Sequence, residues 1–288
     1  MNEMHNDFKL EEVKRNELSY NTLDECVIRA DFMKINDIDR LLEKLNEILS
    51  EYEFRANEVF NIDLEIHDPK TLQTQELIKN NVNKSMNWEY YTPTEKFIVN
   101  NYVLIFYKKI FNNYAGISKY QSTFQKILNE IQNLEENINI TRIGLRKKNI
   151  IFTKANYDWK QILNEDYFPK KYDENLDEIN VSTKILSEDI NTYSYNNLLS
   201  VKKGNAKKDN EDLVVNRIIC DIDYYKRKID KTKINLTDYN DHIFEMYKSI
   251  MNENFIYNLK IGNIDKNNII WGVNKNGNTE QWCLYYWK

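Results

Sequence analysis

Residues 86–109, MNWEYYTPTEKFIVNNYVLIFYKK, contain three short runs rich in aromatic and β-branched residues. Pro93 lies between the first run and the second, and Asn100-Asn101 lies between the second and the third. Both breaks are typical of turns, because proline fixes φ and asparagine tolerates a positive φ. The stretch therefore predicts three consecutive antiparallel strands.

Other segments of the chain extend this pattern on both sides. Residues 26–33 and 60–67 alternate apolar and polar side chains, as a strand does when one face is buried and the other is polar. Longer runs with strand character lie further along the chain. The additional strands are expected at 138–152, 183–187, 194–203 and 213–225.

Three segments carry apolar residues at helical spacing, namely 37–51, 119–134 and 237–252. Strands are long, helices are few, and the regular strand-helix alternation of a parallel sheet does not occur. The predicted fold class is α+β, with an antiparallel sheet or sheets, a few packed helices and a recurring strand–helix–strand unit.

The organisation along the chain suggests two halves that pack into a single globular unit. A short helix is expected around Trp159–Leu163, a basic loop at 204–212, and a closing hairpin with Asn276-Gly277 as its turn. The expected divisions are a flexible N-terminal segment (1–21), a first α+β half (22–152), a connector (153–182) and a second α+β half (183–288).

Composition disfavours several common kinds of site. The 288 residues include only six glycines, and no phosphate-loop, GxGxxG, HExxH, GxSxG or zinc-ligand pattern occurs. The three widely spaced cysteines predict reduced thiols in a cytoplasmic protein. No apolar run is long enough for a membrane span, and the charged first residues do not resemble a signal peptide. We therefore expect a cytoplasmic protein without a membrane partner.

Charge is distributed unevenly along the chain, whose formal net charge is −5. Residues Lys202–Lys233 include ten basic and six acidic side chains. Such a stretch can bind nucleic acid through phosphate contacts, or it can be a solvated surface in a lysine-rich protein. A nucleic-acid partner through this region stays open as one alternative.

Arg142 and Arg146 share one face of the strand expected at 138–152, with Gly144 between them. Glycine lets another group approach closely, and two guanidiniums beside it can grip a phosphate or a carboxylate. They are the predicted ligand-binding residues. The alternative is that they form internal ion pairs with a polar sheet face that includes Asp63 and Glu65.

Asp221 and Asp223 point to the same side of the strand expected at 213–225. Together with Glu245 or His242 they are weak candidates for a catalytic Mg²⁺ or Mn²⁺ site; no other cofactor is expected. The structural alternatives are carboxylates that face water or pair with basic neighbours, and a helix histidine that packs against the core.

Several short motifs resemble a sporadically distributed bacterial family of uncharacterised proteins. The central motif of that family is R-x-G-L-R-Y-x-N, followed later by a D-x-D strand and a helix with a histidine near its start. Lys147 stands where the family has tyrosine. The matching residues are Arg142, Gly144, Leu145, Arg146, Asn149, Asp221, Asp223 and His242.

The resemblance implies no established reaction, but the patchy distribution of the family resembles that of phage-defence loci. The leading interpretation is a binding or regulatory component of an anti-phage or toxin–antitoxin-like system. It would act through protein–protein interaction, with another protein from the same locus or with itself, and not as an enzyme. The alternatives are a metal-dependent nuclease or nucleotidyl enzyme centred on Asp221 and Asp223, and a non-catalytic nucleic-acid binder.

Overall fold

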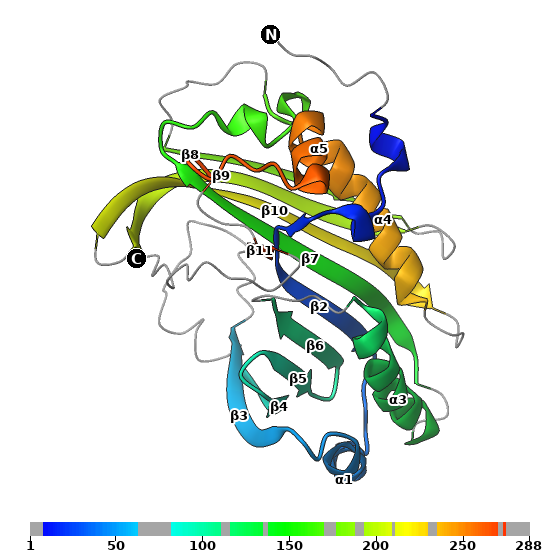
Figure 1. The fold of residues 1–288 in the computed structure, drawn as a ribbon. Coiled ribbons are helices and arrows are strands. Elements are labelled where there is room, and N and C mark those ends of the chain that lie inside the picture. The colour runs from blue at the N-terminus through cyan, green and yellow to red at the C-terminus, as the bar shows by residue number, and fades with distance from the viewer. Residues whose placement is uncertain are drawn as a thin grey trace, which may run out of the picture.

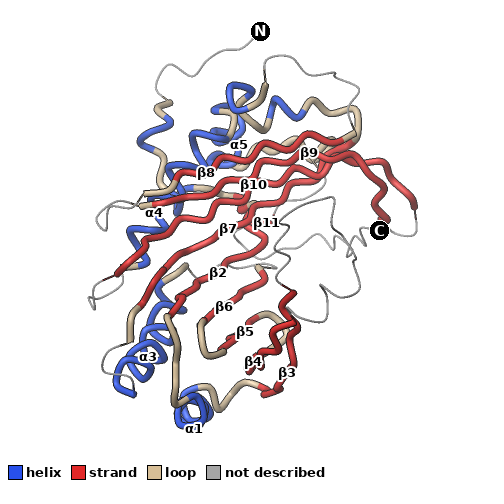
Figure 2. The backbone as a smooth tube through the Cα atoms, turned by 180° about the vertical axis from the view of Figure 1, so that it is seen from behind, coloured by secondary structure: helices blue, strands red, loops and turns tan. Residues whose placement is uncertain are grey.

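A large antiparallel sheet with helices on one face forms most of the protein (Figure 1). Seen from the other side, no helix of the described residues covers the strands (Figure 2). The protein is thus α+β, as predicted, with the sheet as the dominant element. The computed structural model describes residues 8–62, 82–110, 116–134, 138–169, 177–187, 193–208, 211–229, 235–269 and 273–274.

The sheet contains nine strands of the described chain. They are β2 (Leu23–Phe32), β3 (Glu53–Ile62), β4 (Val82–Tyr91), β5 (Glu95–Val99), β6 (Val103–Lys109), β7 (Ile140–Lys154), β8 (Glu178–Ile185), β9 (Ser194–Lys208) and β10 (Glu211–Ile229). Their spatial order is β3-β4-β5-β6-β2-β7-β10-β9-β8. The nine strands form two consecutive groups, β2–β6 and β7–β10, and in each group the first strand pairs with the last: β2 with β6, and β7 with β10. The β2–β7 pair then joins the two groups.

The three strands predicted within residues 86–109 are confirmed as β4, β5 and β6. The backbone N–H of Asn100 donates to the carbonyl of Val103 at 3.0 Å and closes the second turn. The basic loop predicted at 204–212 was wrong, because β9 continues to Lys208 and β10 begins at Glu211. Pairing between two long strands overrides the local preference of these polar residues for a loop. The hairpin predicted at Asn276-Gly277 lies outside the described residues.

Four helices of the described chain pack on one face of the sheet. The three predicted ones are confirmed, and Asp37 caps the first by accepting a hydrogen bond from the Arg40 backbone N–H. The fourth was missed because it is short and starts directly after the third. None of the described helices is long and apolar enough to cross a membrane. The helices are α1 (Ile38–Ile48), α3 (Ser118–Leu134), α4 (Leu236–Ile250) and α5 (Glu253–Ile261).

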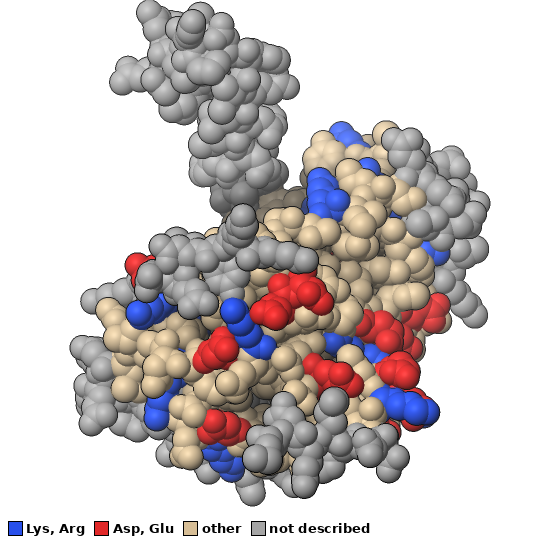
Figure 3. Space-filling view, turned by 90° about the horizontal axis from the view of Figure 1, so that it is seen from above, with Lys and Arg blue, Asp and Glu red and all other residues tan. Residues whose placement is uncertain are grey.

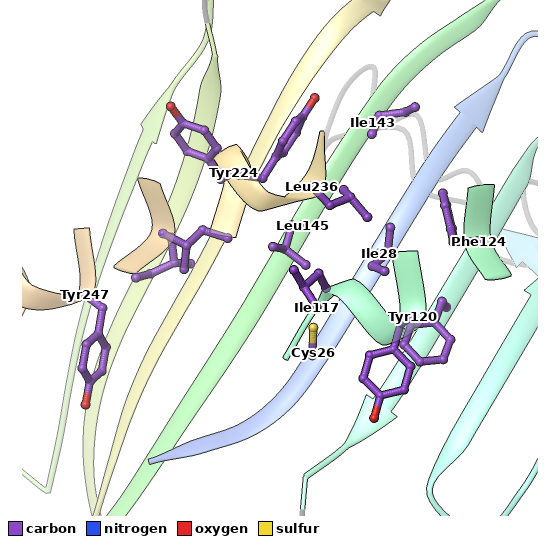
Figure 4. Close-up of a cluster of buried hydrophobic side chains, with 14 of the residues drawn as sticks. Cys26, Ile28, Ile117, Tyr120, Phe124, Ile143, Leu145, Tyr224, Leu236 and Tyr247 are labelled. Atoms are coloured by element: carbon purple, nitrogen blue, oxygen red, sulfur yellow. The ribbon is translucent and has the colours of Figure 1, made fainter. Parts of the chain in front are cut away.

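The core lies between the helices and the sheet (Figure 4). Cys26 and Ile28 of β2 and Ile143 and Leu145 of β7 are completely buried there. Because side chains alternate along a strand, the residues between them point to the opposite side. That side is called the helix-free face below.

The N-terminal segment, expected to be flexible, packs against the helices from residue 8 onward. Val13 is buried, and the Lys248 ammonium on α4 donates to the carbonyls of Glu11 and Val13, each at 3.2 Å. Further on, β1 (Tyr20–Asn21) pairs with β11 (Val273–Asn274). A long side chain from the second half therefore anchors a segment that has little local periodicity of its own.

Lys248→Met is expected to release this segment. The variant retains most of the aliphatic stem but leaves the part-buried carbonyl of Glu11 and the buried carbonyl of Val13 without this donor, a loss of about 2 kcal/mol. Amide hydrogen exchange of residues 8–18 should become faster, and Lys44→Met on the exposed side of α1 serves as the control. Unchanged exchange in this segment would show that Lys248 does not hold it.

Candidate functional site

Four of the five predicted site residues meet on the helix-free face, on the paired strands β7 and β10. Arg146 binds Asp221 in a bidentate manner, with Nε 2.8 Å from Oδ1 and Nη2 2.5 Å from Oδ2. Arg142 Nη2 lies 2.5 Å from Oδ2 of Asp223, which also accepts a bond from Asn196 Nδ2 at 3.3 Å. The arginines and aspartates singled out from the sequence are therefore bound to one another.

The register of the two strands explains these pairs. Arg146 lies directly across from Asp223, and Arg142 directly across from Arg227, so Arg146 reaches diagonally to Asp221, and Arg142 reaches along β10 past Tyr225 to Asp223. Asp221 is buried, whereas the Arg146 side chain is 49% exposed. The hydrogen bonds that Arg146 donates to Asp221 raise the pKa of its guanidinium above the ordinary value. Asp221 therefore holds Nε and one terminal nitrogen of Arg146, while about half of the arginine side chain stays exposed.

Tyr225 occupies the space beside Gly144 that was expected to admit a ligand. A Cβ atom on Gly144 would lie 2.8 Å from the Cβ of Tyr225 and 3.2 Å from the carbonyl oxygen of Tyr224. The Arg142 guanidinium lies 4.2 Å from the centre of the Tyr225 ring, and that of Arg227 lies 6.0 Å from it. The glycine therefore accommodates a neighbouring strand, and the tyrosine orients the arginines by cation–π contact.

The other motif residues also have roles within the fold. Leu145 is a core residue. Asn149 accepts a hydrogen bond from Thr22 Oγ1 at 3.1 Å and donates to the Cys220 carbonyl at 3.3 Å. The Thr22 hydroxyl also lies 2.7 Å from the hydroxyl of Tyr247 on α4. Asn149 thus connects three strands and a helix through buried polar contacts.

The candidate metal ligands are not brought together. His242 and Glu245 lie on α4, on the helix side of the sheet, whereas Asp221 and Asp223 lie on the helix-free face. No group of three His, Cys, Asp or Glu side chains that could hold a metal occurs in the described parts of the chain. Asp63 and Glu65, the other expected partners of the arginines, lie outside the described residues.

His242 belongs to an aromatic cluster on the outer side of α4. Its ring stacks on Tyr224 at a centroid distance of 5.2 Å and lies 5.5 Å from Tyr193. The Lys226 ammonium lies 4.3 Å from the centre of the Tyr193 ring. The histidine therefore packs against a tyrosine surface.

Lys147 was not predicted as a special residue, although it shares a strand face with Leu145. Its side chain is 5% exposed, and its ammonium donates to Oδ1 of Asn240 on α4. On the neighbouring strands, Cys26 and Ile222 lie directly across from it. Burial lowers the pKa of Lys147 to about 7. Lys147 is two residues after Leu145 in a strand, and this spacing was the sequence signal that its side chain would point into the core.

The basic residues of Lys202–Lys233 do not form one patch among the described side chains. Strand alternation places Lys202 and Arg217, which are cross-strand neighbours, on the helix-free face and Lys226 on the helix side. A linear cluster of positive charge is thus divided between two surfaces.

The described parts of the chain also form a cleft of about 1260 Å³ at the end of the molecule where α5 lies. Seen from this side, acidic and basic side chains lie interspersed on the surface (Figure 3). The cleft lining includes Asp158, Glu165, Glu253 and Asp265. None of the predicted site residues lies in this cleft.

Arginines are concentrated on the helix-free face to a degree that composition does not explain. The chain has 32 lysines and eight arginines. Strand alternation and register place six of the eight on this one face, where four of them bind carboxylates. The six are Arg29, Arg55, Arg142, Arg146, Arg217 and Arg227.

No model of a known protein family matches the sequence, and no protein of curated function is significantly similar to it. The resemblance to the sporadically distributed bacterial family therefore stays a prediction that rests on its short motifs.

Proposed function

We propose that the protein is a binding component that acts by contacting another protein through its helix-free face, and that it is not an enzyme. The observation that carries the proposal is the mutual pairing of the candidate residues. Arg142 and Arg146 hold Asp223 and Asp221, so the groups most suited to chemistry neutralise one another. An arginine that is already rigid loses little conformational entropy when it meets a partner.

The composition of the helix-free face supports a protein partner. Protein interfaces are enriched in arginine and aromatic residues with apolar groups between them. Leu198, across from Asp221, is 39% exposed on this face, and Val27 lies across from Arg146. Ion pairs between the arginines of this face and acidic residues of a partner would set the orientation of the partner more than they add affinity.

A role in an anti-phage or toxin–antitoxin-like system is part of this proposal, and it is supported by the family resemblance alone. Under it, the partner is another protein from the same locus or a second copy of the chain. The test is a light-scattering mass, measured on the chain alone and after co-expression with the products of neighbouring genes. We expect a species heavier than the 34.8 kDa monomer in at least one of these preparations. A monomer in all of them contradicts the proposal.

The metal-dependent nuclease alternative leads to a separate prediction. Each of the two carboxylates it requires is held by a guanidinium, which competes with a divalent cation for the same oxygens. We therefore expect neither the wild type nor Asp221→Ala to cleave nucleic acid in the presence of Mg²⁺ or Mn²⁺. Cleavage by the wild type that Asp221→Ala abolishes would establish the alternative in place of our proposal.

A further inference from the structure

Several positions on the helix-free face have arginine where lysine is the commoner basic residue of the chain. Four of the six arginines there use the planar geometry of the guanidinium, either in a bidentate ion pair or against a tyrosine ring: Arg55 with Tyr91, Arg142 and Arg227 with Tyr225, and Arg146 with Asp221. A lysine ammonium can lie over a tyrosine ring, as Lys226 does over Tyr193, but it cannot form the bidentate ion pair with a carboxylate. In a chain with four times as many lysines, the position of Arg146 therefore uses the shape of arginine in addition to its charge.

Hydrogen-bond acceptors are lacking at one place on this face. Arg142 faces Arg227 across the β7–β10 pair. Nε of Arg142 is buried and has no acceptor among the described residues. Arg227 is exposed and contacts the Tyr225 ring, with no ion pair in the described part of the chain. Because that Nε is buried, an additional carboxylate would meet the exposed Arg227 guanidinium and the exposed part of the adjacent Arg142 side chain, which is 23% exposed.

Arg146 provides a second such position on the same strand. Asp221 occupies its Nε and one terminal nitrogen, and half of its side chain remains exposed. Residues four apart on a strand are roughly 13 Å apart. Two carboxylates of an extended partner can therefore reach Arg146 and the Arg142–Arg227 pair at the same time.

The surroundings favour an acidic peptide over a nucleic acid. Asp31, Asp221 and Asp223 lie among the arginines and interrupt the positive charge, whereas a phosphate backbone needs a continuous basic track. The Tyr225 ring is 3% exposed beneath Arg142 and is not available for stacking on bases. A partner segment with separate carboxylates and apolar side chains between them fits this face. Val27 lies across from Arg146, and Leu198 lies across from Asp221.

We infer that the helix-free face binds an acidic, extended protein segment whose carboxylates meet Arg146 and the Arg142–Arg227 pair. This inference rests on the proposed function and specifies the chemistry of the partner.

The test is fluorescence anisotropy of the full chain with a labelled short peptide of alternating glutamate and leucine, at low and at moderate salt. Arg227→Glu is expected to weaken peptide binding about tenfold, and Arg146→Lys, which keeps a cation beside the buried Asp221 but loses the planar guanidinium, is expected to weaken it by a smaller factor. Arg227→Glu places a carboxylate across from Arg142 and so preserves the fold. Arg40→Glu, which makes the same charge change at an exposed position on α1, is the matched control and should leave the affinity within about twofold.

Equal weakening by Arg40→Glu and Arg227→Glu would overturn the inference, because only net charge would then matter. Tighter binding of a single-stranded oligonucleotide than of the peptide, lost in Arg227→Glu, would also overturn it. Peptide binding that depends on Arg227 and Arg146 supports the inference whatever mass light scattering gives. A heavier complex whose peptide affinity ignores both arginines leaves the proposed function standing and removes this inference.

Discussion

Lys147→Met is expected to make the protein more stable at neutral pH, by about 2 kcal/mol. Burial disfavours the charged ammonium of Lys147 and lowers its pKa from 10.5 to about 7. A shift of this size corresponds to a penalty of roughly 5 kcal/mol at most. Part of the gain is offset because Oδ1 of Asn240 loses the donor that Lys147 supplies, which costs about 1–3 kcal/mol. The replacement has a similar length and fills the same space.

The pH dependence provides the sharper measurement. Between pH 7 and pH 10.5 the unfolded chain holds a proton at Lys147 that the folded chain has released. The contribution of Lys147 therefore makes the free energy of unfolding rise with pH in this window, and the penalty is complete below it. The stability difference between Lys147→Met and the wild type should shrink by about 1.4 kcal/mol per pH unit as the pH increases above neutral.

Urea denaturation of both proteins across this pH range measures the effect. Taking the difference between the two curves cancels the contribution of every other titrating group. Lys148→Met, on the adjacent outward-facing position of β7, is the matched control, because it removes an ammonium from the same strand but not from the core. Parallel curves for Lys147→Met and the wild type would show that Lys147 is charged throughout and has its charge compensated.

Gly144→Ala is expected to destabilise the protein by about 2–3 kcal/mol, a large effect for one added methyl group. The new Cβ would lie 2.8 Å from the Cβ of Tyr225 and 3.2 Å from the carbonyl oxygen of Tyr224, closer than such atoms pack. Because β7 is an interior strand that pairs with both β2 and β10, neither neighbour can move without disturbing one of these pairings. The free energy of unfolding from urea denaturation is the measurement.

A double-mutant cycle distinguishes this contact from a general cost. Tyr225→Gly removes the atom that the new methyl meets, so the cost of Gly144→Ala should be smaller in that background. Tyr225→Phe retains the Cβ and should leave the cost unchanged. Equal costs in all three backgrounds would mean that the close approach to Tyr225 is not what excludes a side chain at residue 144.

Local periodicity was sufficient to predict most of the secondary structure. The strands within residues 86–109 and the stripe of α1 were found because each has a regular alternation of apolar and polar residues and a recognisable turn or cap. α5 was missed, and the ends of β9 and β10 that form their hairpin were predicted as a loop. The short α5 is defined by where α4 ends, and the hairpin by pairing between strands whose own residues favour a loop.

The sequence by itself determined the alternation that directs the scarce arginines, Gly144 and the Asp221–Asp223 pair to one side of their strands. Only the tertiary structure decided which of these residues meet. The register of β7 on β10 places Arg142 and Arg146 against Asp223 and Asp221, and it places the ring of Tyr225 beside Gly144. It also separates His242 from the aspartates by the thickness of the sheet. The alternation is a property of each strand alone, whereas the register is set by contacts between segments far apart in the chain.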